Sequence, residues 1–265
     1  MSTRLPVRKT YKLFVGGAFP RSESGRTLEV EGYNVARASR KDVREAVVAA
    51  RKAVAGWSGA TAYNRGQVLY RLAETMETRA ASLAAASGGR REVARAIDRV
   101  VWYAGWADKL AQVLGSSNPV SGPYFNFTLP EPTGVVALVA PDEPALDGLV
   151  ARLAPAIVGG NAVVAIASET HPLAAIELAE AVATSDVPPG VVNVLTGFRA
   201  ELAPVLAGHM DVNAIDVTGA DGDAAALEVL AAENVKRVVR AKEEQSPWEI
   251  ASFMELKTVW HPIGR

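Results

Sequence analysis

Cysteine is absent from the 265 residues of this chain. A thiolate nucleophile, a disulfide and a thiolate-ligated metal centre are therefore excluded, because only sulfur combines a pKa near neutrality with strong nucleophilicity. No run of about eighteen apolar residues occurs, and the first residues lack an apolar core of signal-peptide length. We therefore expect no membrane association and a cytoplasmic location, with which the lack of cysteine is compatible.

The chain also has no large excess of positive or negative charge, since its net charge is −1 and its basic residues are scattered. Such a chain offers no positive field for nucleic acid or an anionic membrane, so neither is an expected partner. The three histidines, His171, His209 and His261, are far apart in the sequence. Without a paired spacing they give no local support for a metal site, and none is predicted.

The first half of the chain predicts a small hairpin and three helices. Short apolar segments at 12–15 and 27–31 flank turn-rich residues and favour pairing of the two segments. Apolar residues at helical spacing predict helices at 42–57, 63–86 and 93–114. The spacing of Trp102, Tyr103 and Trp106 in the last of these is typical of core packing.

From Gly134 onward, continuous apolar runs alternate with helical patterns. The predicted strands are 135–140, 162–167, 191–195, 215–217 and 235–239, and the predicted helices between them are 145–158, 173–184 and 223–233. Apolar strands without polar alternation are buried on both faces, which indicates a parallel sheet covered by helices. The expected fold class is α/β with a doubly wound, Rossmann-like parallel sheet.

Several segments in this half carry a family resemblance. They are GVVALVAP (134–141), LAPAIVGGNAVV (153–164), Ser168-Glu169, VPPGVVNVLTG (187–197) and VTG (217–219). In order and spacing they resemble the cofactor domain of the aldehyde dehydrogenase superfamily. The strand GPYFNFTL (122–129) and the segment MELKTVWHPIG (254–264) are similar to the flap and terminal strand of that family's oligomerisation element. The resemblance implies a cofactor-type domain at 1–250 and an oligomerisation strand at 251–265.

The family's catalytic domain, which contains its cysteine, has no counterpart between these parts. Only the residues between 239 and 254 separate the last predicted strand of the sheet from the terminal segment. A single crossover unit alone needs about 30 residues. The arrangement resembles the non-catalytic second domain of family-sixteen aldehyde dehydrogenases, which implies that a free-standing version needs a partner.

The resemblance also implies loss of the catalytic groups, so no catalytic residue is predicted. The family's oxyanion-hole asparagine aligns with Glu143, whose carboxylate would repel a developing oxyanion. The family's glutamate general base aligns with Ala241, which accepts no proton. The neighbouring Glu243 and Glu244 are interpreted as solvated loop charges.

The resemblance also implies that cofactor binding is weaker than in the family. The family holds the adenosine ribose of NAD through a lysine and a glutamate, and this chain has Ile166 and Glu169 at those places. Glu169 is therefore the one predicted, vestigial cofactor contact, and no bound cofactor is expected. In the segment GADGDA (219–224), Asp221 and Asp223 would repel a pyrophosphate, although either could instead be the N-cap of the next helix.

Three functions compete at this stage. The first is a catalytically inactive, structural or regulatory subunit that binds an active aldehyde dehydrogenase paralogue, or itself, through the flap and terminal strands. The second is an NAD(P)-binding sensor module, supported by the predicted sheet and Glu169. The third is an enzyme of another class, because fold alone does not define function. Titration with NAD and NADP separates the first two.

Overall fold

A five-stranded parallel sheet forms the centre of the computed structural model, which describes residues 9–240 and 245–264. Its order is β10-β9-β6-β7-β8. The strands are β6 (Val135–Val139), β7 (Ala162–Ile166), β8 (Val192–Leu195), β9 (Ala214–Asp216) and β10 (Arg237–Val239). The chain adds β7 and β8 on one side of β6 and β9 and β10 on the other, so its direction reverses between β6 and β9. The predicted doubly wound α/β fold is confirmed.

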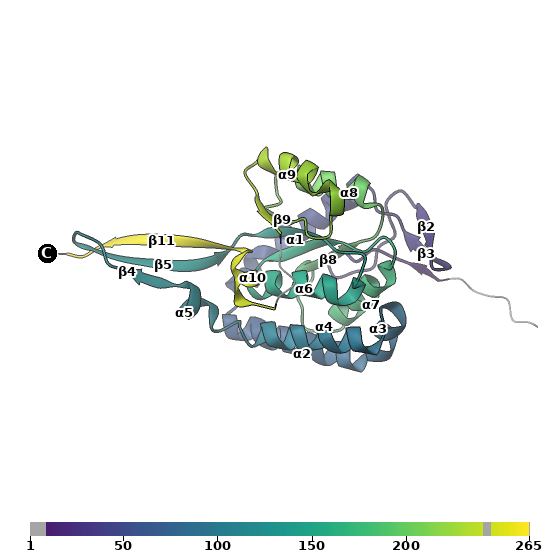
Figure 1. Cartoon of the computed structure of the whole chain (residues 1–265), viewed down its shortest axis with the longest axis horizontal. Coiled ribbons are helices and arrows are strands. Elements are labelled where there is room, and N and C mark those ends of the chain that lie inside the picture. Colours follow the sequence, from purple (N-terminus) through teal and green to yellow (C-terminus); the bar gives the residue numbers. More distant parts are fainter. Residues whose placement is uncertain (1–8, 241–244, 265) are drawn as a thin grey trace, which may run out of the picture.

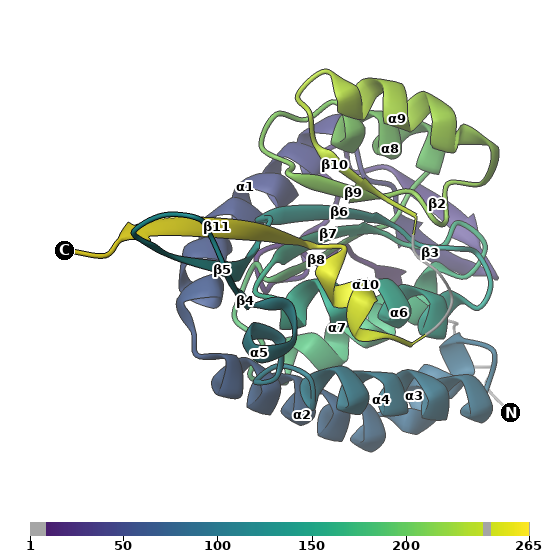
Figure 2. The same ribbon diagram turned by 60° about the vertical axis from the view of Figure 1, so that its left-hand side comes forward.

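Helices cover both faces of this sheet (Figure 2). One face packs against α1 (Arg40–Gly59), α8 (Arg199–Ala207) and α9 (Ala224–Ala232). The other packs against α6 (Ala145–Val158) and α7 (Pro172–Ala183), with α2 (Ala62–Thr78), α3 (Ala80–Ala86) and α4 (Arg90–Ala104) outside them. In β6, Val136 and Leu138 belong to one buried cluster while Val135 and Val139 belong to the other. Burial on both faces explains the continuous apolar runs of these strands.

A three-stranded antiparallel sheet projects from the body as an arm (Figure 1). It consists of β4 (Ser116–Asn118), β5 (Tyr124–Pro132) and β11 (Met254–Pro262), in the order β11-β5-β4. The short helices α5 (Leu110–Leu114) and α10 (Pro247–Ala251) precede β4 and β11. Strands thus occur at both predicted places, 122–129 and 254–260. The division of the chain into 1–250 and 251–265 stays a prediction.

The predicted hairpin between 12–15 and 27–31 is wrong. Instead, β2 (Thr27–Val30) pairs with β3 (Tyr33–Ala36), and β1 (Thr10–Tyr11) pairs with β3 on its other side. Glu31 and Gly32 both have positive φ, which is the geometry of the tight turns that join adjacent antiparallel strands. The segment after β1 docks elsewhere, since the N–H of Phe14 donates to the carbonyl of Val194 in β8 at 3.0 Å.

The helices differ from the sequence predictions mainly at their ends. The tract 63–86 divides at Arg79 into α2 and α3, and the tract 93–114 divides into α4 and α5. Tyr103 is fully buried and its neighbours Trp102 and Trp106 pack against the same core, as predicted. The helix α8 was not predicted. Among the described residues, no helix is long and apolar enough to cross a membrane.

A carboxylate from α4 caps the N-terminus of α6. This helix begins after Pro144 and has no local side-chain cap. Glu92, which is buried, accepts hydrogen bonds from the N–H groups of Leu146 at 2.7 Å and Asp147 at 3.0 Å. Its second oxygen accepts the N–H of Gly88 at 2.5 Å. Negative charge at a helix N-terminus is favourable, so Glu92 joins α4 to α6 as well as satisfying three donors.

We expect Glu92→Ala to lower the free energy of unfolding by about 1–3 kcal/mol, because it leaves buried N–H groups without an acceptor. Chemical denaturation with circular dichroism measures this change. Asp98→Ala is the matched control, since Asp98 is an exposed carboxylate on the same helix, and its change should stay within about 0.5 kcal/mol. Equal stability of the two variants would contradict the capping role.

Candidate functional site

Charged side chains converge at the carboxyl ends of β6, β7 and β9. Asp142 follows β6, Glu169 follows β7, Arg199 is the first residue of α8, and Asp221 begins the 3-10 turn η1 (Asp221–Asp223) after β9. In doubly wound sheets, ligands bind outside these ends, at the point where the strand order reverses. This group of four residues therefore occupies the position where the fold class places a binding site.

Arg199 is the centre of the group. Its Nη2 donates to Asp142 Oδ1 at 2.9 Å and to the carbonyl of Ala140 at 3.2 Å, and its Nη1 lies 3.1 Å from Asp221 Oδ2. The side chain is only 11% exposed, and its buried Nε has no hydrogen-bond partner in residues 9–240 and 245–264. The guanidinium thus lies directly over the end of β6 and is held there by two carboxylates from different loops.

Asp142 organises the loop that follows β7. Its Oδ1 accepts the hydroxyl of Ser168 at 3.0 Å and the N–H of Glu169 at 2.9 Å, in addition to Arg199. Burial acts to raise the pKa of Asp142, but the hydrogen bond from Ser168, the charge of Arg199 and the backbone donors together lower it. The carboxylate is therefore held ionised and serves as a structural acceptor.

Glu169, the predicted cofactor contact, is half-buried at the end of β7. Its Oε1 accepts the N–H of Arg199 at 2.5 Å, which is one of the unpaired donors in the first turn of α8. Ile166, at the place of the family's lysine, is the last residue of β7 and is fully buried in the core. The remaining carboxylate is therefore already engaged within the chain.

The turn after β9 brings the chain close to β6. Asp223 is at the N-cap position of α9, as one of the two alternatives predicted, although neither it nor Asp221 makes a side-chain capping hydrogen bond within the described residues. Asp221 is instead paired with Arg199. A Cβ on Gly219 would come within 2.4 Å of the carbonyl carbon of Ala140, so only glycine permits this approach.

Asp216, which the sequence analysis did not single out, is the last residue of β9 and is fully buried. Burial raises its pKa, opposed by hydrogen bonds from Thr218 and the charge of Arg152. Its Oδ1 accepts the N–H of Thr218 at 2.8 Å, whereas its Oδ2 has no hydrogen-bond partner in the part of the chain that the structure describes. An acidic residue inside an apolar strand was the sequence signal for this position.

Glu143 lies at the edge of a cavity of about 690 Å³, which is also lined by Glu31, Arg91, Arg95 and His171. The side chain of Glu143 is 82% exposed, and its Oε1 is 3.6 Å from His171 Nε2. On the other side of the imidazole, Nδ1 is 2.7 Å from Glu31 Oε1. The hydrogen bond with Glu31 is the main cause of the raised pKa of His171. The surroundings of Glu143 thus offer a carboxylate and an imidazole, with no neutral amide donor at that position.

Ala241, Glu243 and Glu244 lie outside the described residues. Within the described part of the chain, no group of three histidines and carboxylates is close enough to hold a metal ion. The candidate site is made up of residues from four segments, those that follow β6, β7, β8 and β9, and only Glu169 and Asp221 among them were named from the sequence. Arg199 and Asp142 were missed because their roles depend on contacts between distant segments.

Comparison with known proteins assigns the class. The model of the aldehyde dehydrogenase family matches residues 27–261. The chain is 31% identical to aldehyde dehydrogenase, cytosolic 1, of Elephantulus edwardii, over 92% of this chain and 52% of that protein. It is 32% identical to retinal dehydrogenase 2 of Mus musculus, over 90% of this chain and 50% of that protein. The chain therefore spans about half the length of these relatives.

Solved structures give the same result. HpcC from Thermus thermophilus has a TM-score of 0.82 and 31% identity, over 87% of this chain and 47% of that one. The NAD⁺ complex of an aldehyde dehydrogenase from Bacillus cereus has a TM-score of 0.80 and 26% identity, over 87% and 50%. The fold is thus that of a Rossmann-like cofactor domain with an arm. The chain belongs to the aldehyde dehydrogenase family.

Proposed function

We propose that this chain is a catalytically inactive member of the aldehyde dehydrogenase family that acts as a structural or regulatory subunit of an active aldehyde dehydrogenase in the cytoplasm. The observation that carries the proposal is the combination of the family fold with a complete lack of cysteine. Another nucleophile would require a different reaction, because the thiolate alone supplies the needed nucleophilicity near neutral pH.

The short path between the sheet and the arm supports the same proposal. β10 ends at Val239 and β11 begins at Met254, with α10 between them. A further catalytic domain does not fit between these two elements. Glu143 adds to this argument, because an exposed carboxylate does not donate a hydrogen bond to an oxyanion.

The arm supports association with another subunit. β11 is at the edge of its sheet, and Leu256 and Trp260 on it are more than half exposed. A three-stranded arm with an unpaired edge and exposed aromatic side chains is prone to pair with another chain. The proposed partner is an active paralogue or a second copy of this chain.

We expect the purified chain to show no aldehyde-dependent reduction of NAD or NADP. Loss of one oxyanion-hole donor alone costs about 2.7–4 kcal/mol of transition-state stabilisation, and here the nucleophile is absent as well. The measurement is absorbance of the reduced cofactor with short, long and aromatic aldehydes. Turnover that persists in protein shown by mass spectrometry to be free of host dehydrogenases would contradict the proposal.

We also propose that NAD is bound weakly or not at all, so no cofactor is required. Ile166 offers no donor to a ribose, and Glu169 already accepts the N–H of Arg199. Each lost or unpaired polar contact costs about 1–3 kcal/mol, so calorimetry with NAD and NADP should give no dissociation constant in the micromolar range. Micromolar affinity would favour the sensor function, which the NAD⁺ complex of the Bacillus cereus relative supports in addition to the sheet and Glu169.

The register of the arm identifies the donors that face a partner. The N–H of Ile263 donates to the carbonyl of Pro123, and because hydrogen-bonded pairs alternate, Lys257 and Val259 also point their N–H groups toward β5. The backbone N–H groups of Leu256, Thr258 and Trp260 then point toward the open edge of the sheet. Pro130, which pairs with Leu256, fits this register because it has no N–H to donate.

Leu256→Pro should therefore abolish subunit association while leaving the fold intact, because it removes one outward donor. Leu256→Ala retains the N–H and is the matched control, which should keep the assembly of the wild-type chain. Light scattering after size exclusion measures the mass, and circular dichroism measures the fold. A wild-type chain that is monomeric at micromolar concentration and copurifies with no aldehyde dehydrogenase from its native lysate would contradict the subunit proposal.

A further inference from the structure

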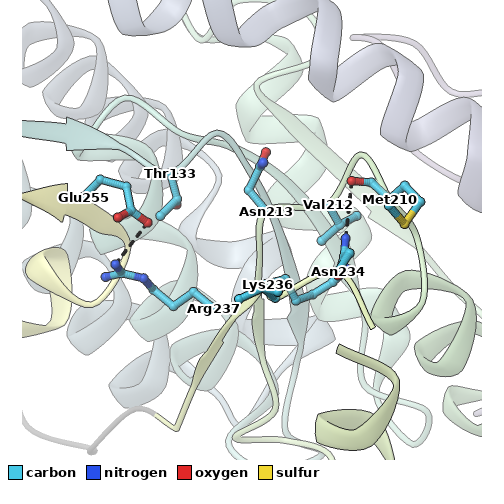
Figure 3. A pocket seen from close by; sticks show the side chains of 9 residues that line it. Thr133, Met210, Val212, Asn213, Asn234, Lys236, Arg237 and Glu255 are labelled. Atoms are coloured by element: carbon cyan, nitrogen blue, oxygen red, sulfur yellow. Dashed lines mark hydrogen bonds and ion pairs between the residues drawn. The ribbon is translucent and has the colours of Figure 1, made fainter. Parts of the chain in front are cut away.

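A second cavity lies at the opposite end of the sheet from the Arg199 group. It has a volume of about 540 Å³ and is bounded by the segments that lead into β6, β9 and β10 and by the start of β11. Figure 3 shows its side chains arranged around the opening. The lining residues are Thr133, Met210, Val212, Asn213, Asn234, Val235, Lys236, Arg237 and Glu255. The volume is in the range of small-molecule sites.

Lys236 brings an uncompensated positive charge to this cavity. The residue is 7% exposed, and its ammonium donates to the carbonyl of His209 and to Asn234 Oδ1, both at 2.9 Å. No carboxylate of the described residues pairs with it. Buried charges in proteins are normally paired, and burial without a counter-ion lowers the pKa of Lys236 to about 8. A negatively charged ligand would supply the counter-ion that Lys236 lacks among the described residues.

The other charges of the lining cancel. Arg237 Nη2 is 3.0 Å from Glu255 Oε1, and its Nη1 donates to the carbonyl of Met254 at 2.7 Å. The lining therefore carries a net charge of one positive unit, that of Lys236. A monoanion balances it, whereas a dianion would leave excess negative charge close to Glu255.

The rim next to Lys236 is apolar. Met210 is 72% exposed and Val235 is 90% exposed, and Val212 lies beside them in the lining. Val235 has φ of 55°, a conformation that is unfavourable for a β-branched residue and that is normally found for glycine after a helix. The sequence thus keeps an exposed, strained valine at the rim, where a glycine would be more stable.

We propose that this cavity binds a small organic monocarboxylate, with its carboxylate at the Lys236 ammonium and a short apolar chain along Met210, Val212 and Val235. Asn213 also lines the cavity, and its Oδ1 accepts from Val135 N–H and Arg51. The site is separate from the carboxyl ends of the strands and is independent of the proposed lack of catalysis.

The test uses hexanoate as the probe. Hexanol, which has the apolar chain without the charge, and inorganic phosphate, which has negative charge without the chain, are the matched controls. The chain has four methionines, so the labelled methyl group of Met210 can be assigned with Met210→Leu and followed by NMR during titration of the wild-type protein. We expect a saturable shift with hexanoate and at least tenfold weaker binding of hexanol and phosphate. Carbon NMR of the lysine side chains should show the pKa of Lys236 rising on binding.

Lys236→Gln should weaken hexanoate binding at least tenfold, whereas Lys52→Gln, at an exposed lysine on α1, should leave it unchanged. If Lys236→Gln does not fold, the wild-type titration decides alone. No saturation with hexanoate up to about 10 mM, a constant pKa of Lys236, or equal binding of phosphate would each overturn the proposal.

Discussion

The side-chain amide of Asn161 ties the arm to the central sheet. Its Nδ2 donates to the carbonyls of Ala156, near the end of α6, and Phe253, just before β11. Its Oδ1 accepts the N–H of Gly134 and the hydroxyl of Thr133, between β5 and β6. One fully buried amide thus fixes where both long arm strands leave the body, although they are far apart in the sequence. A buried amide with all of its partners in place specifies a single geometry, and the direction of the arm depends on it.

Asp142, Glu169, Arg199 and Asp221, at the carboxyl ends of the strands, interact with one another within the chain. Asp142 and Asp221 neutralise Arg199, and Glu169 caps the helix that Arg199 begins. In a binding site, donors and acceptors are left open toward a ligand, because a ligand gains affinity only from groups that are not already paired. Here the same groups hold together the four segments that follow β6, β7, β8 and β9. Their contribution is to the rigidity of this end of the sheet, which agrees with a structural function.

The central fold was predictable from the sequence because burial on both faces leaves a direct signal, the continuous apolar runs of β6 and β7. The errors occurred where local preference and tertiary contacts disagree. Pro204 within α8 argues against a helix, yet packing of Leu202 and Leu206 in the core holds it in place. Glu31, which the sequence placed in the segment 27–31 of the predicted hairpin, instead adopts positive φ in a turn with Gly32. Arg199 resembled an ordinary surface arginine, since its partners come from segments more than 20 residues away.

The two ends of the sheet therefore have opposite electrostatic character. Arg199 is neutralised at the carboxyl end, while Lys236 is buried at the amino end with no carboxylate partner among the described residues. Arg237, next to Lys236, donates to the carbonyls of Ser252 and Met254 and pairs with Glu255, so one wall of the cavity is the first residues of the arm. Arg237 is therefore a structural element common to the cavity lining and the base of the arm, because its hydrogen bonds hold the first residues of β11 against β10.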